Sequence, residues 1–316
     1  MAATTSVFVK EGRSAVPFSR GILMRSIVRS GLDEARAYAL ATDIKADLIK
    51  KNKKSIEVSE LFNVVKSKLD EIDPKFAERY KAWRDIRNSE EPILILLGGV
   101  SGTGTTTVAA ELGHKLGIRR VIGTDSIREV MRKIIAKDLL PTIHASSYDA
   151  WKKMKVPVSP EYDKIIMGFR MQAERIAVGV EALMDRALYE CISAVIEGTH
   201  IVPGFIDKKY MDMPNIFFFI LNVDDEKEHR ARFHARAYET RRASNKYLKN
   251  FKSIRKIQED VINKAKSHGV RVIENDDLEE TTNIITNIVM DKMIKLMNEK
   301  DKNKTSGVNP CFWTPG

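Results

Sequence analysis

The chain has 316 residues, of which 43% are hydrophobic and 30% are charged. This length predicts two domains, and this composition predicts a globular chain rather than a disordered one. Its apolar runs are too short for a membrane-spanning helix, which needs about 20 apolar residues, and the first dozen residues lack the pattern of a secretory signal. Two cysteines are too few for a disulfide framework or a four-cysteine zinc site, so a reducing cytoplasm is the expected compartment.

Basic residues outnumber acidic ones by 53 to 43, which gives a formal net charge of +10. That balance favours anionic partners: nucleotides, phosphorylated metabolites, nucleic acid or an acidic surface. Charge alone does not choose among them, because a lysine-rich composition also accompanies hot or salty habitats.

The first 91 residues form one predicted domain with its linker. Residues 7–18 predict two short strands that are joined by a turn at Lys10–Arg13 and closed by Pro17. From Ser19 to Arg87 the sequence predicts helices, at 19–32, 33–51 and 58–72, and the pair Asp73-Pro74 breaks the third. The polar stretch 87–92 ends in proline and suits a linker.

From residue 92 onward, predicted strands and helices alternate. The apolar run at 93–97 ends in glycines, which is typical of a strand buried on both faces. Further strands are expected at 119–125, 191–198, 215–223 and 270–276, and helices at 105–117, 126–138, 161–189, 224–267 and 278–299. This alternation predicts an α/β fold, with a parallel sheet flanked by helices over residues 92–299. Cys191 is expected to be buried, and residues 300–316 are expected to form a flexible tail.

The strongest motif joins the first of these strands to the helix that follows. It consists of Gly99, Val100, Ser101, Gly102, Thr103, Gly104, Thr105 and Thr106. The spacing is that of the P-loop, G-x-x-x-x-G-K-[ST], except that a threonine, at 105, stands in the lysine position. Glycines let the backbone wrap an anion, and the backbone N–H groups attract phosphate together with the helix N-terminus. We therefore predict that residues 99–106 bind nucleotide phosphates and that Thr106 supplies the hydroxyl for Mg²⁺; a glycine-rich turn without a ligand is the alternative.

Polar residues follow the second and third strands of this sheet. Ligands of open α/β sheets lie at the carboxyl ends of the strands. Asp125 follows the second strand and could accept a proton from an attacking hydroxyl, while Arg128, one helical turn on, could hold an anionic substrate. Glu197 ends the third strand and could act on Mg²⁺, and His200 is a candidate substrate contact. The alternatives are that Asp125 only caps the next helix and that His200 is structural.

Five arginines crowd the segment after the fourth strand, a predicted helix–loop–helix: Arg230, Arg232, Arg236, Arg241 and Arg242. In P-loop kinases a mobile lid occupies this place in the chain and brings arginines to the transferring phosphoryl group. Arg232 and Arg236 are our catalytic candidates, and this lid or Arg128 could replace the missing lysine. The alternatives are a solvated basic helix and, because aromatic residues interleave with the basic ones, a nucleic-acid surface.

With these residues collected, the chain resembles the 2-phosphoglycerate kinase family, known mainly from methane-producing archaea. The resemblance lies in ILLGGVSGTGTTTVAAELGHKLGIRRVIGTDSIREVMRKII and AVIEGTHIVPG. The segment VFVKEGRSAVPFSRGIL resembles the ATP-cone, a small, mostly helical nucleotide-binding module found also in ribonucleotide reductases. Together the two resemblances cover nearly the whole chain except the tail.

The resemblance implies a reaction in which ATP, with Mg²⁺, phosphorylates the 3-hydroxyl of 2-phosphoglycerate to give 2,3-bisphosphoglycerate and ADP. In that family the product feeds the synthesis of cyclic 2,3-bisphosphoglycerate. Asp125 matches the acidic residue with which related P-loop kinases activate the acceptor hydroxyl, and Arg128 completes an Asp-x-x-Arg pattern like that of polynucleotide 5′-kinases. In the ATP-cone-like module, Lys10 and Arg13 are candidate nucleotide contacts, and the module implies regulation or homo-oligomerisation by nucleotide.

Two other functions stay open on the sequence alone. A polynucleotide or nucleoside kinase would also explain the Asp-x-x-Arg pattern and the basic lid. A non-catalytic ATP-binding regulator would explain a P-loop without its lysine. Our expectation is a cytoplasmic small-molecule kinase that takes a phosphorylated substrate and has neither a nucleic-acid nor a membrane partner.

Overall fold

The computed structural model describes residues 6–88, 91–239 and 244–303. The chain divides into two compact units, an N-terminal unit of residues 6–88 and a P-loop unit that begins at residue 91. Within the described ranges, no helix combines the length and the apolar character needed to cross a membrane.

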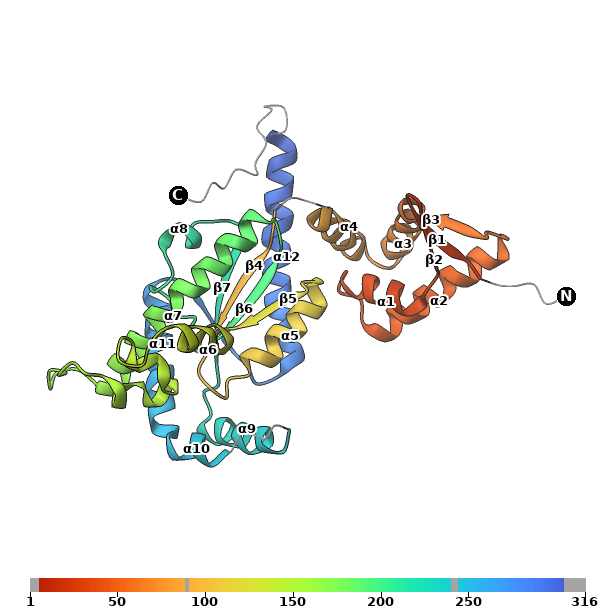
Figure 1. The fold of residues 1–316 in the computed structure, drawn as a ribbon. Helices are drawn as coiled ribbons and strands as arrows, with labels where there is room; N and C mark the ends of the chain where they lie inside the picture. The colour runs from red at the N-terminus through yellow and green to blue at the C-terminus, as the bar shows by residue number, and fades with distance from the viewer. Residues whose placement is uncertain (1–5, 89–90, 240–243, 304–316) are drawn as a thin grey trace. The chain divides into compact units, whose positions relative to one another are not determined.

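A small sheet and four helices make up the N-terminal unit (Figure 1). Its elements are β1 (Phe8–Glu11), β2 (Ser14–Pro17), α1 (Arg20–Val28), α2 (Glu34–Lys50), β3 (Ser55–Glu57), α3 (Val58–Ile72) and α4 (Pro74–Asn88). The strand order is β2-β1-β3, with β1 antiparallel to β2 and parallel to β3. The sequence predicted only helix around residue 56. A three-residue strand is too short to show the alternation of a strand, and its pairing with β1 is a tertiary contact.

The helices of this unit begin where side chains satisfy their first backbone N–H groups. Ser19 Oγ accepts a hydrogen bond from the N–H of Ile22, and Asp33 Oδ1 accepts one from the N–H of Arg36. The predicted break is confirmed, because α3 ends at Ile72 and α4 begins at Pro74. Proline suits that first helical position because its missing N–H would have no partner there.

Five parallel strands in the order β5-β6-β4-β7-β8 form the sheet of the P-loop unit. The strands are β4 (Leu94–Gly98), β5 (Arg120–Gly123), β6 (Ala194–Gly198), β7 (Ile216–Asn222) and β8 (Arg271–Glu274). The α-helices are α5 (Thr105–Leu116), α6 (Thr124–Ile134), α7 (Lys164–Tyr189), α8 (Lys208–Met211), α9 (Glu226–Glu239), α10 (Ser244–Lys249), α11 (Phe251–Ser267) and α12 (Leu278–Asn303). Two short 3-10 helices, η1 (Pro141–His144) and η2 (Ser147–Lys153), lie between α6 and α7.

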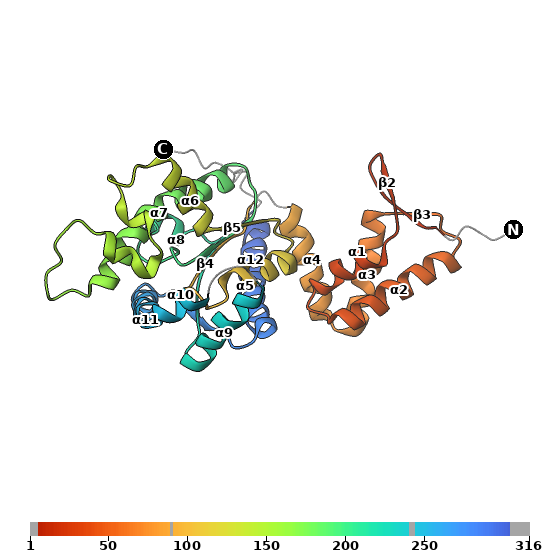
Figure 2. The same cartoon turned by 60° about the horizontal axis from the view of Figure 1, so that its bottom comes forward.

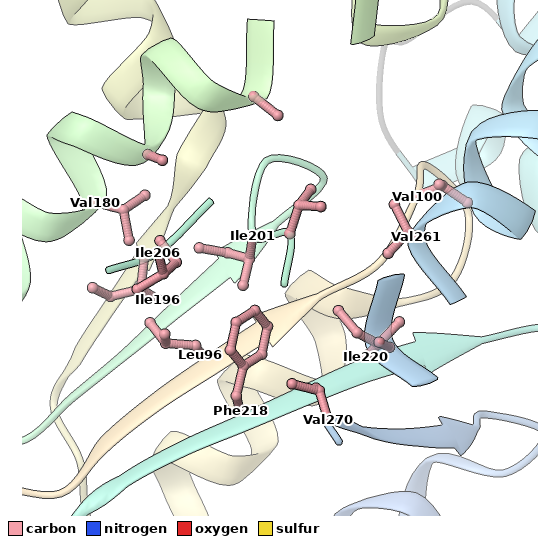
Figure 3. Packing of buried hydrophobic residues seen from close by; sticks show 14 of the residues in the cluster. Leu96, Val100, Val180, Ile196, Ile201, Ile206, Phe218, Ile220, Val261 and Val270 are labelled. Carbon is pink, nitrogen blue, oxygen red and sulfur yellow. The ribbon is translucent and has the colours of Figure 1, made fainter. Parts of the chain in front are cut away.

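Helices cover both faces of this sheet, as an all-parallel sheet requires. On one face, Leu96, Phe218 and Ile220 pack against α7 and α11, through side chains such as Val180 and Val261 (Figure 3). On the other face lie α5 and α12, and Lys292 of α12 contacts the ring of Phe217 (Figure 1). Because every residue of β4 is buried, its apolar run shows no alternation.

The predicted α/β architecture is confirmed, with differences at some boundaries. Cys191 was expected to be buried in a strand, but it is exposed, has φ 50°, and lies in the turn that follows α7; β6 begins at Ala194. The predicted helix 224–267 is divided into α9, α10 and α11. Residues 300–303 continue α12, whereas the remainder of the predicted tail, 304–316, lies outside the described residues.

Candidate active site

Residues 99–104 connect β4 to α5 at the carboxyl edge of the sheet, where α9 and α10 also lie (Figure 1 and Figure 2). Gly102 has φ 93° and Gly104 has φ 87°, which is the left-handed region that glycine adopts without strain. A Cβ on Gly102 would lie 2.6 Å from His229 Nε2, and a Cβ on Gly104 would lie 2.6 Å from Asn275 Nδ2. Close packing as well as backbone conformation therefore requires both glycines.

Protein donors hold three carbonyl groups of this loop. Thr103 Oγ1 donates to the carbonyl of Val100 over 2.9 Å, and Asn275 Nδ2 donates to the carbonyl of Thr103 over 2.8 Å. His229 Nε2 lies 2.9 Å from the carbonyl of Ser101, which can only accept, so this nitrogen carries the proton. Burial lowers the pKa of His229, which is 0% exposed. With these carbonyls already bonded, the loop is preorganised to present N–H groups to an anion.

Thr106 and Glu197 meet beside the loop. Thr106 Oγ1 donates a hydrogen bond of 3.2 Å to Glu197 Oε1, and Glu197 is 7% exposed. Gly123 stands opposite Glu197 in the β5–β6 register, and a Cβ there would lie 2.9 Å from Oε1, so the glycine makes room for the carboxylate. A hydroxyl and a carboxylate are hard oxygen donors and fit Mg²⁺. Among the described residues, no group of three or more His, Cys, Asp or Glu is arranged to hold a metal ion.

Asp125 lies in the first turn of α6, and its side chain is 63% exposed. The N-cap of α6 is Gly123, without a side-chain cap, so the alternative that Asp125 caps the helix is wrong. Arg128 Nη2 lies 3.5 Å from Asp125 Oδ1, and Arg128 Nη1 donates to the carbonyl of Ala145 over 2.5 Å. The Arg128 side chain is only 14% exposed, and its Nε is buried without a hydrogen-bond partner in the described part of the chain. The structure thus brings a carboxylate and a guanidinium together at the end of β5.

His200 is 1% exposed, and protein groups contact both of its ring nitrogens. Nδ1 lies 3.0 Å from Thr124 Oγ1, and Nε2 lies 3.1 Å from Gln172 Oε1. Burial lowers the pKa of His200 to about 4, and Asp125 opposes this effect only in part. The ring therefore presents no open nitrogen to a ligand, and the predicted direct substrate contact gives way to the structural alternative.

The arginines of the segment after β7 have different surroundings. The guanidinium of Arg232 donates to the carbonyl of Asn275, and its Nη1 lies 3.9 Å from the Cβ position of Gly104. Arg232 Nε also donates to Glu228 over 2.9 Å. Arg230 instead covers the ring of Phe251 at 3.8 Å. The side chain of Arg236, and the whole of Arg241 and Arg242, lie outside the described residues.

Comparison with known proteins places this site in a family. The curated 2-phosphoglycerate kinase of Methanopyrus kandleri is 42% identical over 93% of this chain and 90% of its own length. The enzymes of the same name from Methanothermobacter thermautotrophicus and Pyrococcus furiosus are 44% and 43% identical, over 92% and 93% of this chain and 95% and 96% of their own lengths. The chain belongs to the 2-phosphoglycerate kinase family. Residues 7–89 match the family model of the ATP cone domain.

A weaker similarity exists among solved structures. Shikimate kinase from Acinetobacter baumannii aligns with 65% of this chain and 97% of its own, at 14% identity and a TM-score of 0.38. That score is too low to carry a conclusion about this 2-phosphoglycerate kinase family member.

Aromatic rings connect the P-loop of this family member to the segment between α6 and α7. His229 stacks on Phe233 with ring centroids 5.3 Å apart, Phe233 stacks on Tyr247 at 5.1 Å, and Tyr247 meets the edge of Tyr148 at 5.8 Å. We call these four residues the aromatic series. Phe233 and also Phe251 are 1% exposed. The hypothesis that these two rings stack on nucleic acid is therefore wrong, because they are core residues.

The predicted ATP-cone contacts lie on one hairpin of the N-terminal unit. Lys10 is on β1, where it pairs with Ala15, and Arg13 is in the turn between β1 and β2. Both side chains are exposed. Both also fall within the residues that match the ATP cone domain.

Sequence reasoning missed three residues at the active site of the P-loop unit: Gln172, Asn275 and His229. Gln172 is fully buried on α7, between Phe169 and Ile176, so its signal was a polar residue on the apolar face of a helix. Asn275 follows β8 at the same sheet edge as Asp125, and a search of every strand end would have found it. His229 stood in a basic segment that drew attention only to its arginines.

Proposed function

We propose that this chain transfers the γ-phosphoryl group of ATP to the 3-hydroxyl of 2-phosphoglycerate, giving 2,3-bisphosphoglycerate and ADP. Membership of the family supports the substrate. One observation carries the chemistry: three adjacent strands, β5, β6 and β4, end at the same edge in Asp125 with Arg128, in Glu197 and in the P-loop. Phosphoryl transfer needs positioning and charge neutralisation more than covalent help, and this edge offers both.

The nucleotide phosphates are assigned to residues 99–106. Thr105 cannot supply the charge of the usual lysine, and its side chain is 9% exposed. We assign that role to Arg232, whose guanidinium lies beside Gly104, and to Arg236, one turn further along α9. A guanidinium suits a triphosphate because it forms two parallel charge-assisted hydrogen bonds.

Thr106 and Glu197 would hold Mg²⁺, since their oxygens already lie within hydrogen-bond distance. When bound, the ion neutralises charge on the phosphates. The chain's own part is to fix the hydroxyl and the carboxylate in one orientation, which the Gly123 opening beside Glu197 permits.

Asp125 accepts the proton of the acceptor hydroxyl in this proposal. As that proton leaves, the oxygen forms a bond to the γ-phosphorus, and the bond from the γ-phosphorus to the bridging oxygen of ADP breaks. Arg128 lies 3.5 Å away and faces the carboxylate or the phosphate of 2-phosphoglycerate. Because the transition state is loose, an ionised carboxylate beside a guanidinium is an adequate base.

The test is to incubate the purified chain with ATP, Mg²⁺ and 2-phosphoglycerate and to follow 2,3-bisphosphoglycerate by ³¹P NMR. Asp125→Asn is expected to lower kcat by about 10²-fold or more, as for the loss of a general base. Asp138→Asn, the same change at a side chain that is 97% exposed, serves as the matched control and keeps full activity. If the folded wild-type chain forms no product at any salt concentration, the proposal is rejected; transfer to a 5′-hydroxyl oligonucleotide instead would favour a polynucleotide kinase.

We also propose that residues 1–91 form a nucleotide-binding regulatory domain, with Lys10 and Arg13 among its contacts, and that residues 92–299 form the kinase domain. The match of residues 7–89 to the ATP cone domain supports this division. Two ATP sites per chain are then expected by titration calorimetry, and one in the double variant Lys10→Ala, Arg13→Ala. The mass of the particle with and without ATP, from light scattering, tests for nucleotide-dependent homo-oligomers.

A further inference from the structure

We propose that His200 and Gln172 are positioning residues that fix Asp125 and Arg128 for the acceptor, through a closed ring of hydrogen bonds and one ion pair. We call it the polar ring. Its six members contact each other or follow each other in the chain: Thr124, Asp125, Arg128, Ala145, Gln172 and His200. The roles of Asp125 and Arg128 rest on the proposed function, whereas the ring itself is read from contacts.

The first half of the polar ring fixes every proton by elimination. Gln172 faces two backbone carbonyls, those of Thr142 at 2.5 Å and Ala145 at 3.0 Å, so its NH₂ group must point to them. Its Oε1 therefore faces His200 and needs a donor, which places the ring proton on His200 Nε2. His200 Nδ1 is then an acceptor and takes the proton of the Thr124 hydroxyl. The opposite orientation of the amide would set oxygen against oxygen at both carbonyls.

The second half reaches the proposed catalytic pair. The carbonyl of Ala145 accepts from Gln172 and also from Arg128 Nη1. Arg128 Nη2 faces Asp125, which follows Thr124 in the chain and so closes the ring. One edge of the guanidinium is therefore held by the η1–η2 segment, and its direction relative to α6 is set by Gln172. The orientation of Arg128 thus depends on a side chain of α7.

Burial makes the polar ring a rigid device. Gln172 is 0% exposed, and Thr124 and His200 are each 1% exposed, so no water replaces a lost bond. Gly198 leaves the space for Thr124, because a Cβ on this residue, whose φ is 134°, would lie 2.2 Å from Thr124 Oγ1. Positioning matters here because a misplacement of about 1 Å can lower a rate by about 10²-fold.

The test is Thr124→Val, which removes the hydroxyl at nearly constant shape, beside Thr124→Ser, which keeps it. Thr124→Val is expected to lower kcat/KM for 2-phosphoglycerate by about 10-fold or more, and to change KM for ATP by less than about twofold. Thr124→Ser is expected to recover most of the loss. Val270→Ala, in the core at the amino end of β8, is the control for a purely structural effect: its melting temperature falls while both kinetic constants stay.

A second measurement needs neither a variant that folds nor a substrate. In ¹⁵N-histidine spectra of the wild-type chain, His200 is expected to be neutral with its proton on Nε2; the signal is assigned with His200→Gln. A proton on Nδ1 overturns the polar ring, and so does a Thr124→Val enzyme whose kcat/KM for 2-phosphoglycerate is unchanged. If the wild-type chain were inactive toward 2-phosphoglycerate, the proposed function would fail while the spectra still decided the ring.

Discussion

Acidification is expected to destabilise the P-loop unit through His200. The unfolded chain takes up a proton on this histidine near its ordinary pKa of 6.5, whereas burial holds the folded pKa at about 4. Between those values only the unfolded state is protonated, so the free energy of unfolding falls by about 1.4 kcal/mol for each pH step, or about 3 kcal/mol in all. Asp125 and Arg128 are the charges nearest the ring, and burial outweighs both. Such a loss is a large share of a typical stability of about 5–15 kcal/mol.

The assay is urea unfolding of the wild type and of His200→Gln at pH 7, 6 and 5. Labelling with 5-fluorotryptophan and ¹⁹F NMR separates Trp151, in η2, from the other tryptophans, so the P-loop unit is followed by itself. His229, whose pKa is also lowered by burial, is present in both proteins and cancels. The stability difference between the two proteins is expected to shrink by about 2 kcal/mol from pH 7 to pH 5. A difference that stays constant would refute a buried neutral His200.

Three further substitutions test the active site. Gly102→Ala forces a positive φ and places a Cβ against His229, so urea unfolding should show a loss of about 1–3 kcal/mol, and calorimetry should show weaker ATP binding; unchanged ATP affinity would contradict the loop assignment. Thr106→Val should lower kcat on the order of 10²-fold at saturating ATP and Mg²⁺, while Thr107→Val, an exposed neighbour, should not. Arg128→Lys should raise KM for 2-phosphoglycerate about tenfold, because lysine lacks the planar fork, and Arg132→Lys, one turn along α6, should leave it unchanged; equal effects of the two arginine changes would argue against the role of Arg128.

The sheet could be predicted from the sequence because its strands are buried on both faces. Runs such as Ile93–Leu97 are apolar throughout, and turns and helices separate them. The errors fell where tertiary contacts decide. Cys191 adopts φ 50° at the surface after α7, and nothing in its apolar neighbourhood indicates that turn. β3 exists because Ile56 pairs beside Val9, a contact between residues far apart in the chain.

The active site was predictable where a motif is continuous. The P-loop spacing located Thr106, and the ends of β5 and β6 located Asp125 and Glu197. The residues that support these groups come from distant segments: Gln172 lies 47 positions after Asp125 in the chain, yet it determines how Arg128 is held. Such partners carry no local pattern, since their role is created only when α7 packs beside α6.

The aromatic series has a consequence for how the two substrates affect each other. It runs from His229, which holds the P-loop, to Tyr148, beside the segment that holds Arg128. Interiors are close-packed, so a ring does not shift without its neighbour. Ordering that one substrate imposes on these rings need not be repeated by the other, and linkage makes the benefit equal in both directions. Binding synergy between nucleotide and acceptor therefore follows from four side chains that touch neither molecule's reacting atoms.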